Sequence, residues 1–134
     1  MPINHWRVIL KPEWGIWETC RDRGIIAIGY QDSPDNIDVQ RFKNRMKMGD
    51  KIIAYLRSGQ IGAIGTITGN YSVDEVVLRA HFWRIRKVQW DHKSSNGFRL
   101  RLSKETRVAL SQRPAIVELS KAQFEEIESQ VLSR

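Results

Sequence analysis

The sequence contains one cysteine, Cys20, in 134 residues. A single thiol cannot form an intramolecular disulfide or a cysteine-based zinc site, so we expect the thiol to stay reduced inside the cell. No apolar run approaches the length of a membrane span, and the N-terminus lacks a signal-peptide hydrophobic stretch. Together these absences predict a cytoplasmic protein.

Motifs of common enzyme classes are also missing. There is no HExxH, no Walker loop, no GxSxG and no PD…(D/E)xK nuclease pattern. The histidines at positions 5, 81 and 92 are too scattered along the chain to indicate a metal cluster. Cys20 follows Trp17 in a predicted helix, which favours a buried structural thiol over a nucleophile. The sequence therefore predicts a protein that is not an enzyme and has no metal or cofactor.

Acidic residues are scarce in one part of the chain. The 22 Lys and Arg residues exceed the 15 Asp and Glu residues, which gives a formal net charge of +7. Between Arg79 and Arg101 there are seven basic residues and one acid, Asp91, whereas residues 103–134 contain five of each sign. A solvated basic surface would explain the total charge, but its localisation favours a face that binds a polyanion.

The length and composition indicate a single domain over residues 1–134, with 41% hydrophobic and 28% charged residues. Many short apolar segments separated by turn residues predict strands, and fewer segments with helical spacing predict helices. We expect an α+β fold in which a small β-barrel of about six strands is flanked by helices.

The expected strands occupy residues 5–10, 25–30, 51–56, 61–68, 77–89 and 98–102, with a short extended piece at 116–119. Residues 92–97 are expected to form a polar loop. Helices are expected from Pro12 to a Gly24 cap, from Asp35 or Asn36 to about Met48, and over 103–111. A last helix begins at a Ser120–Gln123 capping box and carries an apolar stripe of Phe124, Ile127 and Val131.

Tryptophan is frequent, with five residues at positions 6, 14, 17, 83 and 90. Core packing explains any single one, because a buried indole contributes a large apolar area. Over residues 79–90, however, aromatic and basic residues interleave along a predicted strand, which is typical of a surface where bases stack and phosphates pair. An arginine packed over an indole would give the same pattern. The residues predicted to contact a nucleic-acid backbone are Arg57, Arg84, Arg86, Lys87, Lys93 and Arg99.

A pocket is predicted at the exit of the strand that runs from Gly24 to Tyr30. Gly29 permits a flat ring to approach the backbone, and Tyr30 offers a face for stacking. Asp32 and Ser33 follow in a turn and supply polar groups for a base edge. Trp90 is interpreted as part of the pocket rim, with core packing as the alternative.

Four segments resemble, in their order and spacing, the EVE domain and its YTH-like relatives in the PUA superfamily. They are Gly24–Tyr30, Met46–Tyr55, Ile61–Gly65 and Arg86–Trp90. The resemblance covers roughly residues 6–90, and the last third is similar only in pattern. It implies a small β-barrel with a pocket that accepts a flipped, modified base. YTH members read N6-methyladenine in RNA, EVE-like members are linked to modified DNA bases, and related domains recognise DNA in McrBC-type restriction systems.

The resemblance also implies where the pocket residues lie. YTH proteins have a cage tryptophan at the position of Ile26, which is followed here by Ala27. Tyr30, or Trp17 from the preceding helix, then takes its place. Tyr71 is the nearest candidate for the second cage aromatic.

The predicted function is a non-catalytic module that recognises methylated adenine or cytosine, in DNA more than in RNA. Its partners would be nucleic acid and a fused or associated NTPase or nuclease module of a restriction system. The alternative is a PUA-like module that binds RNA or an acidic protein without selectivity for a modified base.

Overall fold

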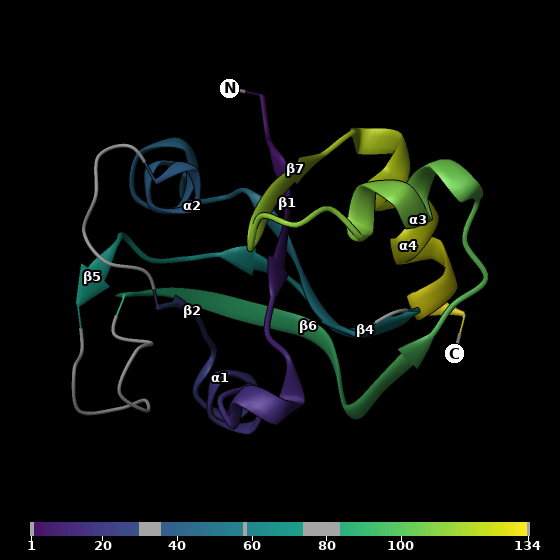
Figure 1. The fold of residues 1–134 in the computed structure, drawn as a ribbon, viewed down its shortest axis with the longest axis horizontal. Coiled ribbons are helices and arrows are strands. Elements are labelled where there is room, and N and C mark those ends of the chain that lie inside the picture. The colour runs from purple at the N-terminus through teal and green to yellow at the C-terminus, as the bar shows by residue number, and fades with distance from the viewer. Residues whose placement is uncertain (1, 30–35, 58, 74–83, 134) are drawn as a thin grey trace.

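The strands form one curled seven-stranded sheet, in the order β2-β6-β4-β3-β1-β7 with β5 paired to β6 (Figure 1). This computed structural model describes residues 2–29, 36–57, 59–73 and 84–133. The strands are β1 His5–Ile9, β2 Ile25–Ile28, β3 Lys51–Arg57, β4 Gln60–Ile67, β5 Ser72–Val73, β6 Arg84–Arg99 and β7 Ile116–Leu119. The helices are η1 Pro12–Trp14, α1 Trp17–Arg23, α2 Ile37–Gln40, η2 Arg41–Arg45, α3 Lys104–Leu110 and α4 Lys121–Leu132.

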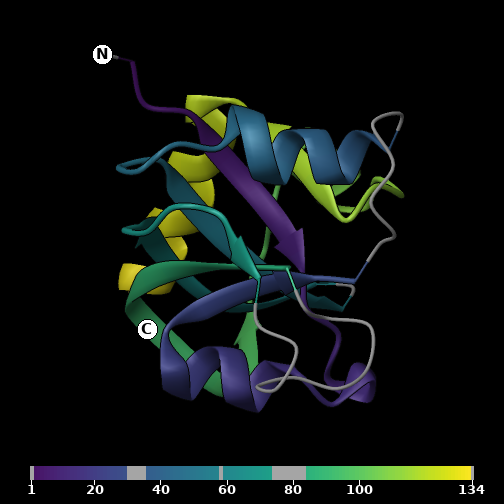
Figure 2. The same ribbon diagram turned by 90° about the vertical axis from the view of Figure 1, so that its left-hand side faces the viewer.

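The α+β class is confirmed, and the sheet is a half-barrel. Its pairing path ends on β2 and β7, so the described strands leave two edges where the expected barrel of about six strands would close. Strands β1 and β3 pair in parallel and the other pairs are antiparallel. Both views place α1 on one side of the strands and α2 on another (Figure 2).

The sheet is covered on both faces, which gives two hydrophobic cores. In β3, Ile52, Ala54 and Leu56 belong to one core, and Ile53 and Tyr55 belong to the other. Successive side chains of a strand point to opposite faces, so a strand with apolar residues at consecutive positions is buried on both. The first core includes residues of α1, α2 and η2, and the second includes residues of α3 and α4.

The predicted loop at residues 92–97 is part of one long strand. Strand β6 runs from Arg84 to Arg99 and pairs with β4 over residues 88–93 and 98–99, on both sides of this stretch. The register moves from Ala63 opposite Lys93 to Ile61 opposite Phe98, so the extra residues bulge out between two paired stretches. The sequence suggested two strands because the bulge contains Ser, Asn and Gly, which are typical of turns. Residues 77–83 of the expected strand lie outside the described residues.

Several other expectations need correction. The single helix expected from Pro12 to Gly24 is divided, because η1 ends at a left-handed Gly15 with a φ of 75° and α1 begins at Trp17. The helix expected to reach Met48 ends at Arg45, where Met46 turns to an extended backbone. Its last part is a wide turn in which the Met46 amide donates to the Arg41 carbonyl at 2.8 Å. The strand expected to end at Leu102 already ends at Arg99, and the two-residue strand β5 was not expected.

The predicted helix boundaries are otherwise confirmed where a cap was recognised. The Asn36 side chain accepts hydrogen bonds from the Asp38 and Val39 amides. Gly24 ends α1 in the left-handed region at a φ of 68°, where its amide donates to the Cys20 carbonyl. The Ser120–Gln123 capping box is present, and the apolar stripe of α4 is buried. None of the helices in the described part of the chain is long and apolar enough to cross a membrane.

Cys20 provides a test of the first core. It is fully buried, and desolvation raises the pKa of its thiol to about 12. At pH 8 only about one thiol in ten thousand would then be ionised, and the thiolate is the reactive form. We expect a thiol reagent such as DTNB to leave the folded protein unlabelled for hours and to label it fully in urea. Rapid stoichiometric labelling of protein with native circular dichroism would contradict this packing.

Candidate functional site

The two tryptophans predicted to line a base pocket pack against each other. The Trp17 ring is 2% exposed and meets Trp90 edge to face, with centroids 5.8 Å apart. The Trp17 Nε1 donates to the Ser94 carbonyl at 3.3 Å, and the Trp90 Nε1 donates to the Cys20 carbonyl at 3.0 Å. A Cβ added at Gly62 would lie 2.7 Å from the Trp17 ring. The pair therefore joins α1 to β6, and Trp17 has no room to face a flipped base.

Two other predicted pocket residues of the Gly24–Ser33 region lie in the core, and three lie outside the described residues. Ile26 and Ala27 are buried in β2, where they pair with Arg86 and Ile85 of β6. Their side chains fill the first core instead of a cavity. Tyr30, Asp32 and Ser33 lie outside the described residues.

Arg84 and Arg86, two of the residues predicted to contact phosphates on an exposed strand face, are buried. Their exposures are 1% and 3%, so these guanidinium groups do not form an outer docking face. The Arg84 Nη1 donates to the Tyr71 hydroxyl. The sequence pattern could not separate this arrangement from a surface, because a strand face that holds buried arginines has the same alternation as an exposed one.

Arg86 is held almost entirely by backbone carbonyls. Its Nη1 donates to the Phe42 carbonyl at 3.0 Å and to the Met46 carbonyl at 2.7 Å. Its Nε and Nη2 donate to the Gly69 carbonyl at 3.1 and 2.9 Å. Burial lowers the pKa of the Arg86 guanidinium, and the negative charge of Asp50 opposes that change. Four of its five N–H groups are thus used within the fold, which leaves one on Nη2.

The other predicted backbone contacts are exposed. Lys87, Lys93 and Arg99 lie at exposed positions along β6. Arg57, at the end of β3, has its Nη2 3.7 Å from a carboxylate oxygen of Glu13. The structure therefore keeps an exposed row of cations on β6, although the two arginines at its start are buried.

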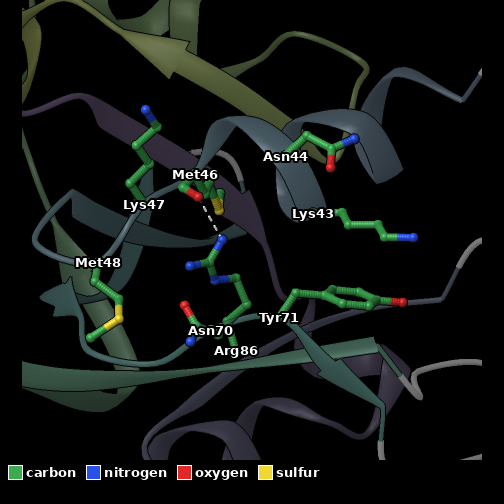
Figure 3. A pocket seen from close by; sticks show the side chains of 8 residues that line it. All are labelled: Lys43, Asn44, Met46, Lys47, Met48, Asn70, Tyr71 and Arg86. Carbon is green, nitrogen blue, oxygen red and sulfur yellow. Dashed lines mark hydrogen bonds between the residues drawn. The ribbon is translucent and has the colours of Figure 1, made fainter.

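A pocket of about 430 Å³ opens beside Arg86, between η2 and the segment before β5 (Figure 3). We call it the α2 pocket, because η2 directly continues α2. Its lining residues are Lys43, Asn44, Met46, Lys47, Met48, Asn70, Tyr71 and Arg86. Three of these side chains are cationic and none is a carboxylate. An anion that enters it would meet cations without an opposing acid on the lining.

Tyr71 forms the aromatic wall of the α2 pocket. Its ring meets Phe42 edge to face at a centroid distance of 6.1 Å. The Lys43 Nζ lies 5.5 Å from the ring centroid, and the Arg84 Cζ lies 5.9 Å from it. Figure 3 shows the Lys43 side chain alongside the ring and the Arg86 guanidinium between Met46 and Asn70. Tyr71 contacts Arg84, which is six positions before Trp90 on β6, a separation of roughly 20 Å along the strand. Tyr71 is thus separated from Trp17 and Trp90.

Sequence reasoning identified Tyr71 and Arg86 but missed their neighbours. Lys43 and Lys47 are four residues apart, and the sequence suggested only that they lie on the outer face of a helix. Asn70 precedes Tyr71 in a short connection. The hydrogen bonds of Arg86 and the packing of Phe42 on Tyr71 bring the end of this helix beside that connection. Among the described side chains, no three of His, Cys, Asp or Glu converge as metal ligands.

Comparisons with known proteins identify the fold. A family model described as Domain of unknown function (DUF8426) matches residues 37–114. No curated protein sequence matches the chain. The solved structure of the Mmi1 YTH domain in complex with RNA superimposes with a TM-score of 0.67, at 8% identity over 97% of this chain and 78% of that one.

Two proteins of similar length share the same fold. A hypothetical protein from Leishmania major has a TM-score of 0.61 at 13% identity, and 98% of this chain and 96% of that one are covered. A Pseudomonas putida protein also has a TM-score of 0.61, at 18% identity over 94% and 98% of the two chains. At such low identity these likenesses show a YTH-like fold.

The buried role of Arg86 predicts a large loss of stability on substitution. Arg86→Met would leave carbonyls of Phe42, Met46 and Gly69 without a donor, so we expect a loss of about 3 kcal/mol or more in the free energy of unfolding. Lys87→Ala, at the exposed neighbouring position, should cost less than about 0.5 kcal/mol. Urea unfolding followed by circular dichroism measures both. Equal effects would show that Arg86 does not hold the fold.

Proposed function

The chain belongs to the family described as Domain of unknown function (DUF8426), and we propose that this member is a non-catalytic nucleic-acid-binding module. The α2 pocket is the observation that carries the proposal, because it combines three cations with an aromatic ring and has no carboxylate on its lining. Support comes from the YTH-like fold, since one neighbour with that fold is a YTH domain in complex with RNA.

The chemistry of the α2 pocket suits one nucleotide. A phosphate between Lys47 and Arg86 would pair with an ammonium group and with the remaining N–H of the guanidinium. A base could stack against Tyr71, and the Asn70 amide has both a donor and an acceptor for its edge. The exposed cations of β6 would extend the contact to neighbouring phosphates.

The proposal includes selectivity for a modified base, with DNA favoured over RNA. Its support is the sequence resemblance to EVE and YTH-like domains of the PUA superfamily. In this proposal Tyr30, Asp32 and Ser33 contact the base together with Tyr71, because Trp17 and Trp90 pack against each other. The resemblance also suggests a restriction system as the setting, in which another module would supply catalysis.

The first test removes charge from the α2 pocket. Lys43→Ala/Lys47→Ala changes two exposed residues, so the fold should be retained. We expect weaker binding of single-stranded RNA and DNA, and a decrease of about 1.4 in the slope of log K against log salt, because each lost phosphate contact contributes about 0.7. Fluorescence anisotropy at several salt concentrations measures both quantities.

The control for this test is Arg23→Ala/Lys121→Ala, which removes the same charge at two exposed positions outside the α2 pocket. It should change the slope little. The proposed function fails if the wild-type protein shows no salt-dependent binding, or if the pocket variant and the control behave alike.

The second test addresses the modified base. Oligonucleotides with unmodified bases, N6-methyladenine, 5-methylcytosine or 5-hydroxymethylcytosine would be compared as single strands and duplexes, with matched RNA. One methyl group in an apolar slot is worth roughly 1–3 kcal/mol, so we expect a preference of about tenfold to a few hundredfold. Tyr30→Ala should reduce that preference towards unity and leave the salt-sensitive component intact. Full preference in this variant would exclude Tyr30 as the stacking residue.

A further inference from the structure

A second basic surface surrounds α3. Two adjoining hollows share Ser111, Gln112 and Arg113 in the segment after this helix. Their lining includes five cations that we call the α3 surface, Lys11, Arg57, Lys104, Arg107 and Arg113. All five residues are exposed. The sequence indicated only Arg57 of this group as a phosphate contact, and residues 103–134 have no net charge.

Folding separates the charges of this balanced segment. Glu13 is the one acid on the lining of the two hollows, and its carboxylate lies 3.7 Å from Arg57. Glu126, by contrast, accepts hydrogen bonds from Ser103 and Thr106 and is not part of either lining. On the two linings cations therefore outnumber acids by five to one, and a bound polyanion would reduce the repulsion among them.

The backbone beneath the α3 surface is rigidly held from inside. The Arg7 side chain is fully buried, and its Nη1 donates to the Leu110 carbonyl at 2.6 Å and to the Gln112 carbonyl at 2.9 Å. Its Nη2 donates to the Pro114 carbonyl. One guanidinium group thus binds three carbonyls of the segment that presents Arg113. Such an arrangement lowers the entropy lost when the surface binds a partner.

The α3 surface and the α2 pocket lie far apart. Figure 1 has the longest axis horizontal, with α2 near the left end and α3 near the right. A domain of this length has a radius of gyration of roughly 14 Å, so the molecule is roughly 40 Å wide. One polymer that extends across this width can contact both places. A single strand of about 20 nucleotides spans roughly 70 Å at 3.4 Å per nucleotide.

We propose that the α3 surface binds the phosphate backbone of the same nucleic acid that occupies the α2 pocket. The inference rests on the proposed function and extends its footprint across the domain. Three of the five cations are arginines, whose forked donors match phosphate oxygens. The Gln112 amide adds a neutral donor of the kind that contacts phosphates. Val108 is the one strongly exposed apolar side chain on the lining, and Tyr55, its one aromatic residue, is only 8% exposed. The surface therefore lacks the exposed aromatic and apolar anchors of a protein interface.

The experiment compares two oligonucleotide lengths. A strand of about five nucleotides spans roughly 17 Å and can occupy only one of the two places, whereas one of about 20 nucleotides can reach both. Arg107→Ala/Arg113→Ala changes two exposed residues of the α3 surface. The matched variants are Lys43→Ala/Lys47→Ala in the α2 pocket and Arg23→Ala/Lys121→Ala as the charge control.

We expect the α3-surface variant to bind the short strand with wild-type affinity and the long strand about tenfold more weakly. Its salt slope on the long strand should fall by about 1.4, from two lost phosphate contacts. The α2-pocket variant should weaken both lengths, and the charge control should change neither by more than about twofold.

Wild-type affinity of the α3-surface variant for the long strand would overturn the inference. Equally weakened binding of the short and the long strand would also overturn it, because the effect would not depend on whether a strand can contact both places. Polyglutamate serves as a second probe. If it binds the wild-type protein and not the α3-surface variant, while the long strand binds both equally, the surface is one for an acidic protein. The proposed function fails separately if the α2-pocket variant matches the charge control on both lengths.

Discussion

The placement of the Arg86 side chain is the constraint on which the first half of the structure depends. Its guanidinium group binds the carbonyls of Phe42 and Met46, at the end of the helical segment, and the carbonyl of Gly69 after β4. A cation at a helix C-terminus is stabilised by carbonyls that no helical amide can satisfy. One side chain on β6 thereby joins the end of η2 to the connection before β5, which makes the walls of the α2 pocket meet.

Arg7 has the corresponding role on the other face of the sheet. It extends from β1 into the second half of the molecule and binds carbonyls of the segment after α3. In both cases hydrogen bonds to several acceptors offset the free-energy cost of burying a charged side chain. The fold thus uses two arginines to position irregular backbone, and each of these backbone segments borders a surface that carries exposed cations.

Asp50 completes the arrangement on the side of Arg86. Its carboxylate accepts hydrogen bonds from the amides of Asn4 and Lys47 and from the Trp6 Nε1, at 2.9 to 3.2 Å. These contacts attach the N-terminal segment and the turn after η2 to one buried acid. The negative charge also favours the nearby Arg86 cation. The exposed lysines around the pocket are therefore left with no acid on its lining, so their charge remains available to a ligand.

Local patterns in the sequence determined the elements with clear chemical signals. Asn36, Gly24 and the Ser120–Gln123 pair marked helix ends, because capping depends on residues that are neighbours in the chain. Alternation and turn residues likewise indicated most strands and the α+β class. The net positive charge also followed from the sequence.

Only the tertiary structure decided which cations and rings are exposed. Arg84, Arg86 and Lys87 are close in the sequence, yet two are buried and one faces solvent. Carbonyls from distant segments surround Arg86, and the Tyr71 hydroxyl accepts a hydrogen bond from Arg84. Trp17 and Trp90 are likewise paired by the approach of α1 to β6. The charge-balanced C-terminal segment becomes a basic surface because folding turns its acids and cations in different directions. These outcomes depend on contacts between residues far apart in the chain, which no local spacing encodes.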